Sequence, residues 1–179
     1  MPQDALNAKK NLKKKRYNLV LPIIFFFIID RAAKIILKDK LLHGETIQII
    51  GDKIRLTLVY NKGAAFGIFQ NSSFFLTVVS LVILISVFKI LASLQKERSF
   101  LKYAFILIAS GALGNIFDRL YYGYVVDFID VDIPDIIPNF PRWPVFNFAD
   151  AYITIGVIMV IIYLFFMKEE KIKNASGNN

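Results

Sequence analysis

The sequence contains no cysteine and only one histidine, His43. The lack of cysteine excludes disulfides, thiolate metal sites and a cysteine nucleophile, and one histidine cannot make a two-histidine zinc motif. No internal repeat is visible either, which argues against an inverted-repeat transporter. The chemistry left to this chain is that of carboxylates, hydroxyls, lysines and amides, and we expect neither a metal nor another cofactor.

Charged residues make up only 20% of the 179 residues, whereas hydrophobic residues make up 56%. A mean hydropathy of +0.52 is too high for an ordinary soluble domain. The net charge of +8 would suit nucleic acid, but the cations gather at the ends of apolar runs instead of alternating with aromatics. We therefore expect a single integral membrane domain over residues 1–179 and no nucleic-acid partner.

Apolar runs near residues 17–37, 74–94, 101–121 and 149–167 are each long enough to cross about 30 Å of hydrocarbon as a helix. The first follows a basic segment, as in a signal peptide, but it lacks a small-x-small cleavage site and reads as an uncleaved anchor. The positive-inside rule places both termini in the cytoplasm and the connections 38–73 and 122–148 outside. We therefore expect a multi-pass protein of the bacterial inner membrane.

The two outer connections differ in character. Apolar and polar residues alternate over 53–60, and Gly51-Asp52 can turn the chain back from 46–50, which predicts a β-hairpin. The second connection is rich in proline and aromatic residues, which favours an irregular or partly helical segment at the headgroup level. The predicted fold class is a mainly α membrane protein with four transmembrane helices and a small extracytoplasmic β-sheet.

Ionisable residues inside a membrane span are costly and usually functional. Four lie toward the outer ends of the spans: Asp30, Lys34, Asp118 and Arg119. The third span also places a polar set on one helix face: Gly111, Asn115, Asp118 and Tyr122. A structural alternative is that Gly111 and Gly114 serve close helix packing while Asp118 forms an ion pair with Arg119 or Lys34.

Asp127 follows the third span and Asp150 begins the fourth, so both carboxylates return to the same depth at the outer interface. Two carboxylates brought together cannot both ionise cheaply; one holds a proton while the other activates water, as in aspartic proteases. Structural alternatives remain for both residues. Asn147 and Asp150 have the spacing of a helix N-cap with an acid at its third position, and Asp127 can be a solvated loop acid.

Three further patterns leave alternatives open. A calcium site from Asp130, Asp132 and Asp135 lacks the glycine and glutamate of the usual loop. The segment 61–67 permits either a plain turn or the presentation of the Asn61 amide to a peptide carbonyl. A serine-lysine protease would have Lys34 as its only candidate base at the outer interface, and no serine is convincingly placed near it.

Four blocks of sequence, in order, resemble bacterial lipoprotein signal peptidase, also called signal peptidase II. The blocks are Asn61-Lys-Gly-Ala-Ala-Phe-Gly67, Gly111-Ala-Leu-Gly-Asn-Ile-Phe-Asp-Arg119, Val125-Val-Asp-Phe128 and Phe146-Asn-Phe-Ala-Asp150. The resemblance runs from about Leu21 to Leu164. It implies an aspartic endopeptidase that cuts diacylglyceryl-modified prolipoproteins just before the lipidated cysteine, and that globomycin-like peptides inhibit.

The resemblance implies that Asp127 and Asp150 are the catalytic residues. It also implies that Asn61, Asn115, Arg119 and Asn147 hold the substrate or order the pair. The residues themselves add Gly63, Asp118, Asp30 and Lys34 as further supporting or substrate-binding candidates. One position departs from the family pattern, because Ala33 stands where a threonine or serine is usual, which leaves open how Asp30 is hydrogen-bonded. A monomer is expected because one chain supplies both carboxylates.

Two other classes of protein compete with the peptidase. In an ion-binding or transport protein, Asp30, Asp118, Asp127 and Asp150 would line a polar pathway. Such a pathway needs polar groups through the whole membrane depth, whereas the cytoplasmic halves of the four spans are almost entirely apolar. A purely structural assembly subunit would leave the four blocks unexplained. The asymmetry therefore favours a site at one surface.

Overall fold

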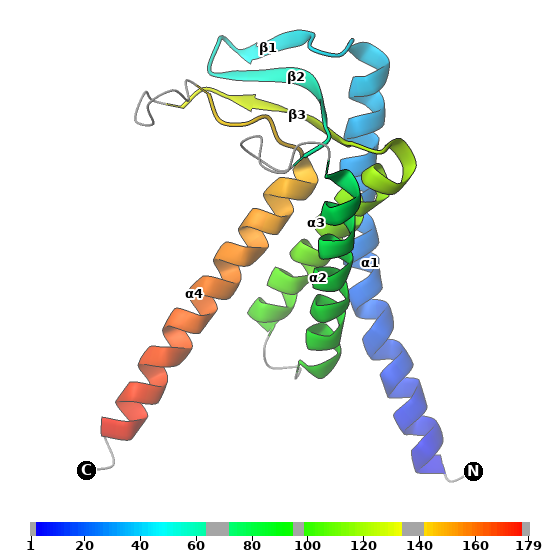
Figure 1. Cartoon of the computed structure of the whole chain (residues 1–179). Helices are drawn as coiled ribbons and strands as arrows, with labels where there is room; N and C mark the ends of the chain where they lie inside the picture. The colour runs from blue at the N-terminus through cyan, green and yellow to red at the C-terminus, as the bar shows by residue number, and fades with distance from the viewer. Residues whose placement is uncertain (1–2, 64–71, 95–98, 134–141, 177–179) are drawn as a thin grey trace.

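A computed structural model of the chain describes residues 3–63, 72–94, 99–133 and 142–176, with side chains within residues 19–166. Four helices and three strands follow the chain in this order: α1 (Gln3–Lys40), β1 (Thr46–Ile50), β2 (Ile54–Asn61), α2 (Ser73–Ser93), α3 (Ser99–Tyr122), β3 (Val125–Val131) and α4 (Phe148–Ser176). The sheet lies at one end of the helices and both chain termini lie at the other (Figure 1).

Within the described residues, three helices can cross a membrane by length and composition alone: α2, α3 and the residues 148–166 of α4. They agree with three of the four predicted spans. The apolar part of α1 contains Asp30, Arg31 and Lys34, so its crossing stays a prediction. The helix α1 also begins well before the predicted span, because the basic segment continues the same helix.

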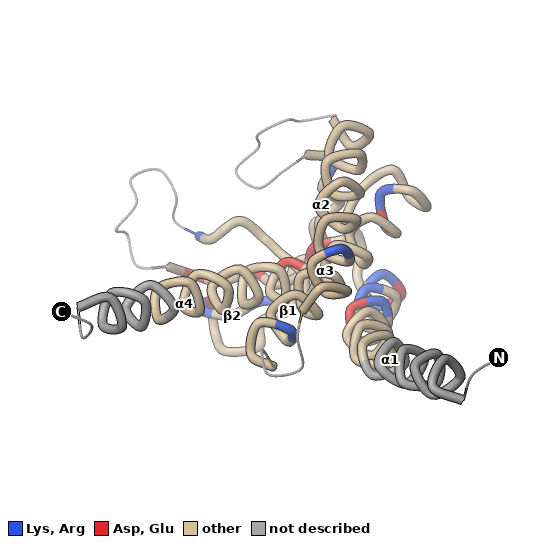
Figure 2. Tube along the Cα trace, turned by 90° about the horizontal axis from the view of Figure 1, so that it is seen from below, with Lys and Arg blue, Asp and Glu red and all other residues tan. Residues whose placement is uncertain are grey.

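Helix α3 is the centre of the helical part and contacts α1, α2 and α4. Within an apolar 18-residue stretch of each helix, 61% of the residues are buried in α3, against 22% in α2 and 11% in α4. Helices α2 and α4 therefore turn most of their apolar side chains outward. Figure 2 shows that the described parts of α2 and α4 are almost entirely free of charged residues. These outward faces suit a lipid environment.

Glycines allow α3 and α4 to approach closely. A Cβ added at Gly111 would lie 2.2 Å from the carbonyl oxygen of Ala149, and one at Gly156 would lie 2.6 Å from that of Ala104. Small residues bring helix backbones together in this way when lipid offers no hydrophobic drive for association. The predicted packing role of Gly111 therefore agrees with the structure, and it places the beginning of α4 against α3.

The predicted hairpin is present, since β1 pairs antiparallel with β2 from Thr46 opposite Thr57 to Ile50 opposite Ile54. The prediction for the second outer connection was wrong at its beginning, because Val125–Val131 forms a third strand antiparallel to β2. Its β-branched and aromatic residues favour a strand. The acids within it had made the segment look like a loop.

The sheet rests on α1 through a small apolar cluster formed by Leu41, Leu58 and Val126, each at most 4% exposed. At the other edge of the sheet, residues 142–146 lie alongside β3 and the residue after it. Backbone pairing there joins Ile129 to Phe146 and Asp132 to Arg142. Three prolines of the second outer connection, Pro134, Pro138 and Pro141, lie outside the described residues. The segment 142–146 leads directly into α4.

Candidate active site

Asp127 on β3 and Asp150 in the first turn of α4 meet on either side of Asn147. The side-chain amide of Asn147 donates to Asp127 Oδ1 over 2.6 Å, and its backbone N–H donates to Asp150 Oδ2 over 3.2 Å. Asn61 Nδ2 donates to the other oxygen of Asp127 over 2.9 Å, and Asn115 Nδ2 donates to Asp150 Oδ1 over 2.7 Å. The structure thus brings together the two carboxylates that the sequence predicted to meet.

Backbone pairing fixes Asn147 in this position. The backbone N–H groups of Phe128 and Ile129 donate to the carbonyl of Phe146, and Phe146 N–H donates back to the carbonyl of Ile129. Asn147 is therefore the first residue after a segment paired with β3. Its Oδ1 accepts the N–H of Asp150 over 2.9 Å, so it also caps α4. The Asp150 carboxylate therefore takes the predicted structural role at the beginning of α4, and it also lies across Asn147 from Asp127.

Burial governs the ionisation of Asp127. The residue is 1% exposed, and burial is the largest cause that raises the pKa of its carboxyl from 3.8 to about 7. The negative charge of Asp150 raises this pKa further, while hydrogen bonds from Asn61 and Asn147 lower it. Near neutral pH the pair can hold one proton between its two carboxylates, which is the state that acid–base chemistry on a peptide requires.

A buried ionic cluster supports the pair from the side of α1. Lys34 Nζ lies 2.7 Å from Asp30 Oδ2 and 2.9 Å from Asp118 Oδ2, and all three residues are 0% exposed. Lys34 Nζ also donates to Asn115 Oδ1 over 3.4 Å. Since Asn115 donates in turn to Asp150, a continuous set of polar contacts runs from α1 to the pair.

Two earlier expectations about this cluster are resolved. Asp118 pairs with Lys34, as one alternative predicted, and also with Arg31, which the sequence reasoning missed. Arg119 has its electrostatic interactions with Asp150, Asp127 and Asp118 instead of a direct ion pair with Asp118. The guanidinium of Arg31 lies over the Phe117 ring, at 4.5 Å from its centre. The only sign of this contact in the sequence was that Arg31 directly follows Asp30 within the first predicted span.

Asp30 needs no hydroxyl from position 33. Its Oδ1 accepts the backbone N–H of Ala149 over 3.0 Å, and its Oδ2 pairs with Lys34. The Ala149 N–H is one of the free donors at the beginning of α4, where a carboxylate is favoured by the helix dipole. A Cβ at Gly114 would lie 2.7 Å from Asp30 Oδ2, so the glycine makes room for this contact.

Gly63 and Asn61 form a local turn in which Gly63 N–H donates to Asn61 Oδ1 over 2.9 Å. This bond orients the amide so that its Nδ2 points to Asp127. The amide that was predicted to reach a peptide carbonyl is therefore bonded to a carboxylate in this structure. The rest of the motif, residues 64–67, lies outside the described residues.

Asp130 is bonded to cationic groups rather than arranged for calcium. Arg55, Arg142 and Thr57 all donate to its carboxylate. Burial raises the pKa of Asp130, but the hydrogen bonds and charges of these partners more than offset it and leave the pKa below its ordinary value. Asp135 lies outside the described residues, and within the described ranges no three acidic or histidine side chains gather as a metal site would require.

A helical membrane protein with a carboxylate pair at one end of its helices is the class that this geometry defines. The sequence matches the family described as Signal peptidase (SPase) II over residues 22–166. The chain therefore belongs to the signal peptidase II family, which is a family of peptidases.

Individual relatives agree with this assignment. The lipoprotein signal peptidase of Clostridium novyi (strain NT) is 39% identical over 145 residues, which cover 81% of this chain and 95% of that protein. That of Clostridioides difficile (strain 630) is 37% identical, covering 84% and 97%. A solved structure described as a bacterial membrane enzyme, determined by the in meso method at 2.3 Å resolution, is 33% identical with a TM-score of 0.78, covering 86% and 91%.

Proposed function

We propose that this chain is an intramembrane aspartic endopeptidase that removes signal peptides from diacylglyceryl-modified prolipoproteins, cleaving just before the lipidated cysteine. The family and the named relatives support the substrate class. The observation that carries the catalytic type is the pair of carboxylates bonded to two sides of Asn147. No third protein group has to enter the chemistry, because a pair that shares one proton supplies both acid and base.

In the proposed reaction, the ionised member of the pair takes a proton from a water molecule, whose oxygen attacks the scissile carbonyl carbon. The protonated member gives its proton to the carbonyl oxygen as the tetrahedral intermediate forms. Collapse of this intermediate breaks the C–N bond. The carboxyl that took the water proton gives it to the leaving nitrogen, and the other carboxylate takes a proton from one hydroxyl of the intermediate, so the pair again holds one proton. Asn61, Asn115 and Asn147 hold the two carboxylates in place throughout, since the side-chain amide of each donates to one of them.

The position of the pair suits a substrate that is itself held in the membrane. The strand β3, which contains Asp127, and the beginning of α4, which contains Asp150, lie where the helices meet the sheet, at the end opposite both chain termini (Figure 1). A signal helix and a diacylglyceryl group would keep the scissile peptide near this interface, where water is available. We further propose that both termini are cytoplasmic, that the site faces the outer side of the inner membrane, that the chain acts as a monomer, and that globomycin-like peptides block it.

The test is cleavage of a diacylglyceryl-modified prolipoprotein by the purified protein in detergent. The parent is compared with Asp127→Asn and Asp150→Asn at equal folded amounts, because each change keeps the shape of the side chain and removes its acid–base function. We expect cleavage before the lipidated cysteine by the parent and a loss of several orders of magnitude in each variant. Failure of the folded parent on a verified substrate would refute the proposal and favour ion binding. Activity retained by either variant would refute the proposed pair.

A further inference from the structure

Arg142 and Asp130 form the centre of an ionic contact between four segments of the outer region. Arg142 Nε donates to Asp130 Oδ1 over 2.5 Å, and its NH1 donates to the carbonyl of Asp52 over 2.8 Å. The second oxygen of Asp130 accepts from Arg55 Nε over 3.1 Å and from Thr57 Oγ1 over 2.9 Å. The contact joins β2, the turn before it, β3 and the segment 142–147.

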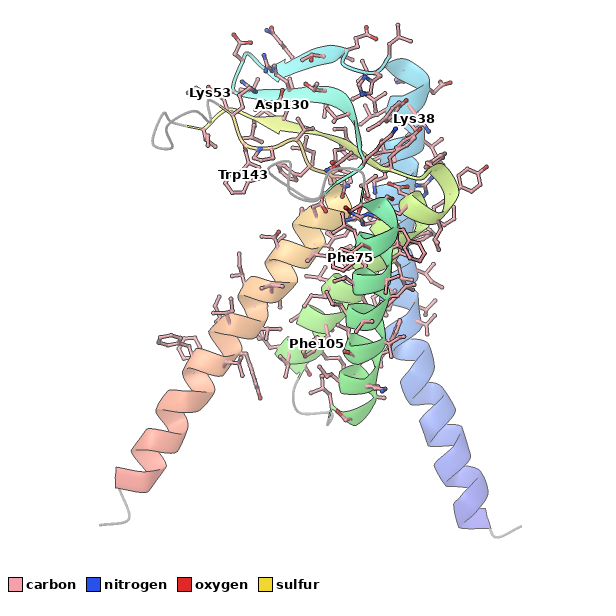
Figure 3. The ribbon with its side chains drawn as sticks, viewed as in Figure 1. Lys38, Lys53, Phe75, Phe105, Asp130 and Trp143 are labelled. Carbon is pink, nitrogen blue, oxygen red and sulfur yellow. The ribbon has the colours of Figure 1, made fainter. Side chains whose placement is uncertain are left out.

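This contact is built to persist. Asp130 is only 4% exposed, and both of its oxygens accept hydrogen bonds from charged or hydroxyl donors. Charge-assisted bonds that meet every oxygen of a buried carboxylate are strong, whereas the loss of one partner leaves that oxygen unsatisfied. Asp130 and Lys53 lie at the end of the sheet away from α1 (Figure 3). None of these groups touches the carboxylate pair directly.

The backbone connects this contact to the pair over a few residues. Arg142 bridges to Asp132, Trp143 N–H donates to the carbonyl of Val131 over 2.9 Å, and Phe146 exchanges hydrogen bonds with Ile129. Asn147 comes next. The segment 142–147 thus runs along β3 from Asp130 to Asp127, with Arg142 at one end and Asn147 at the other. A slip at the Arg142 end would displace Asn147, whose side-chain amide donates to Asp127 and whose backbone N–H donates to Asp150.

We propose that Arg142, acting through Asp130, is a positioning residue of the peptidase site, which holds segment 142–147 against β3 so that Asn147 contacts both aspartates. This inference rests on the proposed function. The positioning is indirect, and it therefore affects turnover more than substrate capture. A displacement of about 1 Å at reacting groups lowers rates on the order of 100-fold.

The experiment compares Arg142→Gln with Arg142→Lys, Asp130→Asn and the double variant, all as full-length protein in detergent. Lys53→Gln is the matched control, because it removes an exposed cation from the same end of the sheet. For Arg142→Gln we expect kcat to fall about 10- to 100-fold with KM within about threefold. We expect Arg142→Lys to restore part of kcat. The double variant, Arg142→Gln with Asp130→Asn, should lower kcat no further than Arg142→Gln alone, and the control should behave as the parent.

A second readout does not depend on cleavage. Titration of the Asp127 carboxyl is followed by NMR in protein labelled with 13C at aspartate, with Asp127→Asn to assign the signal. Asp127 is faced by Asp150 on α4, Arg119 on α3, Lys34 on α1 and Asn61 on β2, and none of these changes in the variants. Losing the Asn147 bond would raise the pKa of Asp127, whereas water admitted by a loosened segment would lower it. Because burial is the largest cause of the raised pKa, we expect a net lowering of the midpoint in Arg142→Gln.

The outcomes separate this inference from the proposed function. If the parent cleaves and Arg142→Gln matches it in kcat and in the Asp127 midpoint, the positioning role is overturned while the peptidase stands. If the parent does not cleave, the proposed function is overturned and the Asp127 midpoint alone decides the positioning role. If Arg142→Gln does not fold, Arg142→Lys and Asp130→Asn decide it, with an unchanged kcat and midpoint in both as the refuting result.

Discussion

Asp127 should destabilise the folded protein at neutral and higher pH, and Asp127→Asn should relieve this cost. The carboxyl has a pKa of about 7 in the folded chain, against 3.8 as its ordinary value. Between these two pH values the folded chain holds a proton that the unfolded chain has released. The contribution of Asp127 to stability is therefore complete below pH 3.8, falls as the pH rises, and is lost above about 7.

The size of the effect follows from the shift. At 1.36 kcal/mol per pKa unit, a rise from 3.8 to about 7 corresponds to roughly 4 kcal/mol. Asparagine carries no charge at any pH, but its amide would face the amide donors of Asn61 or Asn147 and lose about 1 to 2 kcal/mol of hydrogen bonding. We expect Asp127→Asn to stabilise the fold at pH 8 by about 2 kcal/mol.

The assay is thermal unfolding of the purified protein in detergent at several pH values between 4 and 8. A gain of about 2 kcal/mol raises Tm by roughly 4 to 8 °C in a chain of this size. Asp39→Asn is the control, because Asp39 is an exposed carboxylate outside the site. The reasoning is refuted if Asp127→Asn is no more stable than the parent at pH 8 and keeps the parent's loss of stability between pH 4 and 7. That result would show that the fold does not raise the pKa of Asp127.

The other predictions concern the groups that hold the site. Asn147→Ala should lower kcat about 100-fold because it loses the bond to Asp127; Asn147→Ser keeps a capping oxygen, so it should recover stability in thermal unfolding but not kcat. Lys34→Met should cost about 3 to 5 kcal/mol in detergent unfolding, since two buried carboxylates lose their shared cation, and a cost below 1 kcal/mol would contradict this. Gly111→Ala should prevent native packing of α3 on α4, because the added Cβ would lie 2.2 Å from a backbone oxygen; an unchanged Tm would show that the helices can separate without cost.

Much of the architecture was predictable because local patterns carry it. Long apolar runs predict helices α2, α3 and α4 whatever their packing, since a bilayer requires each backbone to satisfy its own hydrogen bonds. The alternation before Tyr60 and the glycine turn likewise predict the hairpin of β1 and β2. The strand β3 was missed because Asp127 and Asp130 resemble solvated loop acids until the partners that bury them are known.

The residues alone establish which chemical groups are available in a chain without cysteine, and they predict that Asp127 and Asp150 return to the same end of the helices. The packing of the chain in space, by contrast, places Asn147 between the two carboxylates, adds Arg31 to the ion pairs of Asp118 and bonds Arg142 to Asp130. Those contacts join residues far apart along the chain, and their partners are set by the pairing of β3 and the packing of α3 on α4. The raised pKa of Asp127 has the same origin, because burial is a property of the assembled fold and not of any segment of the chain.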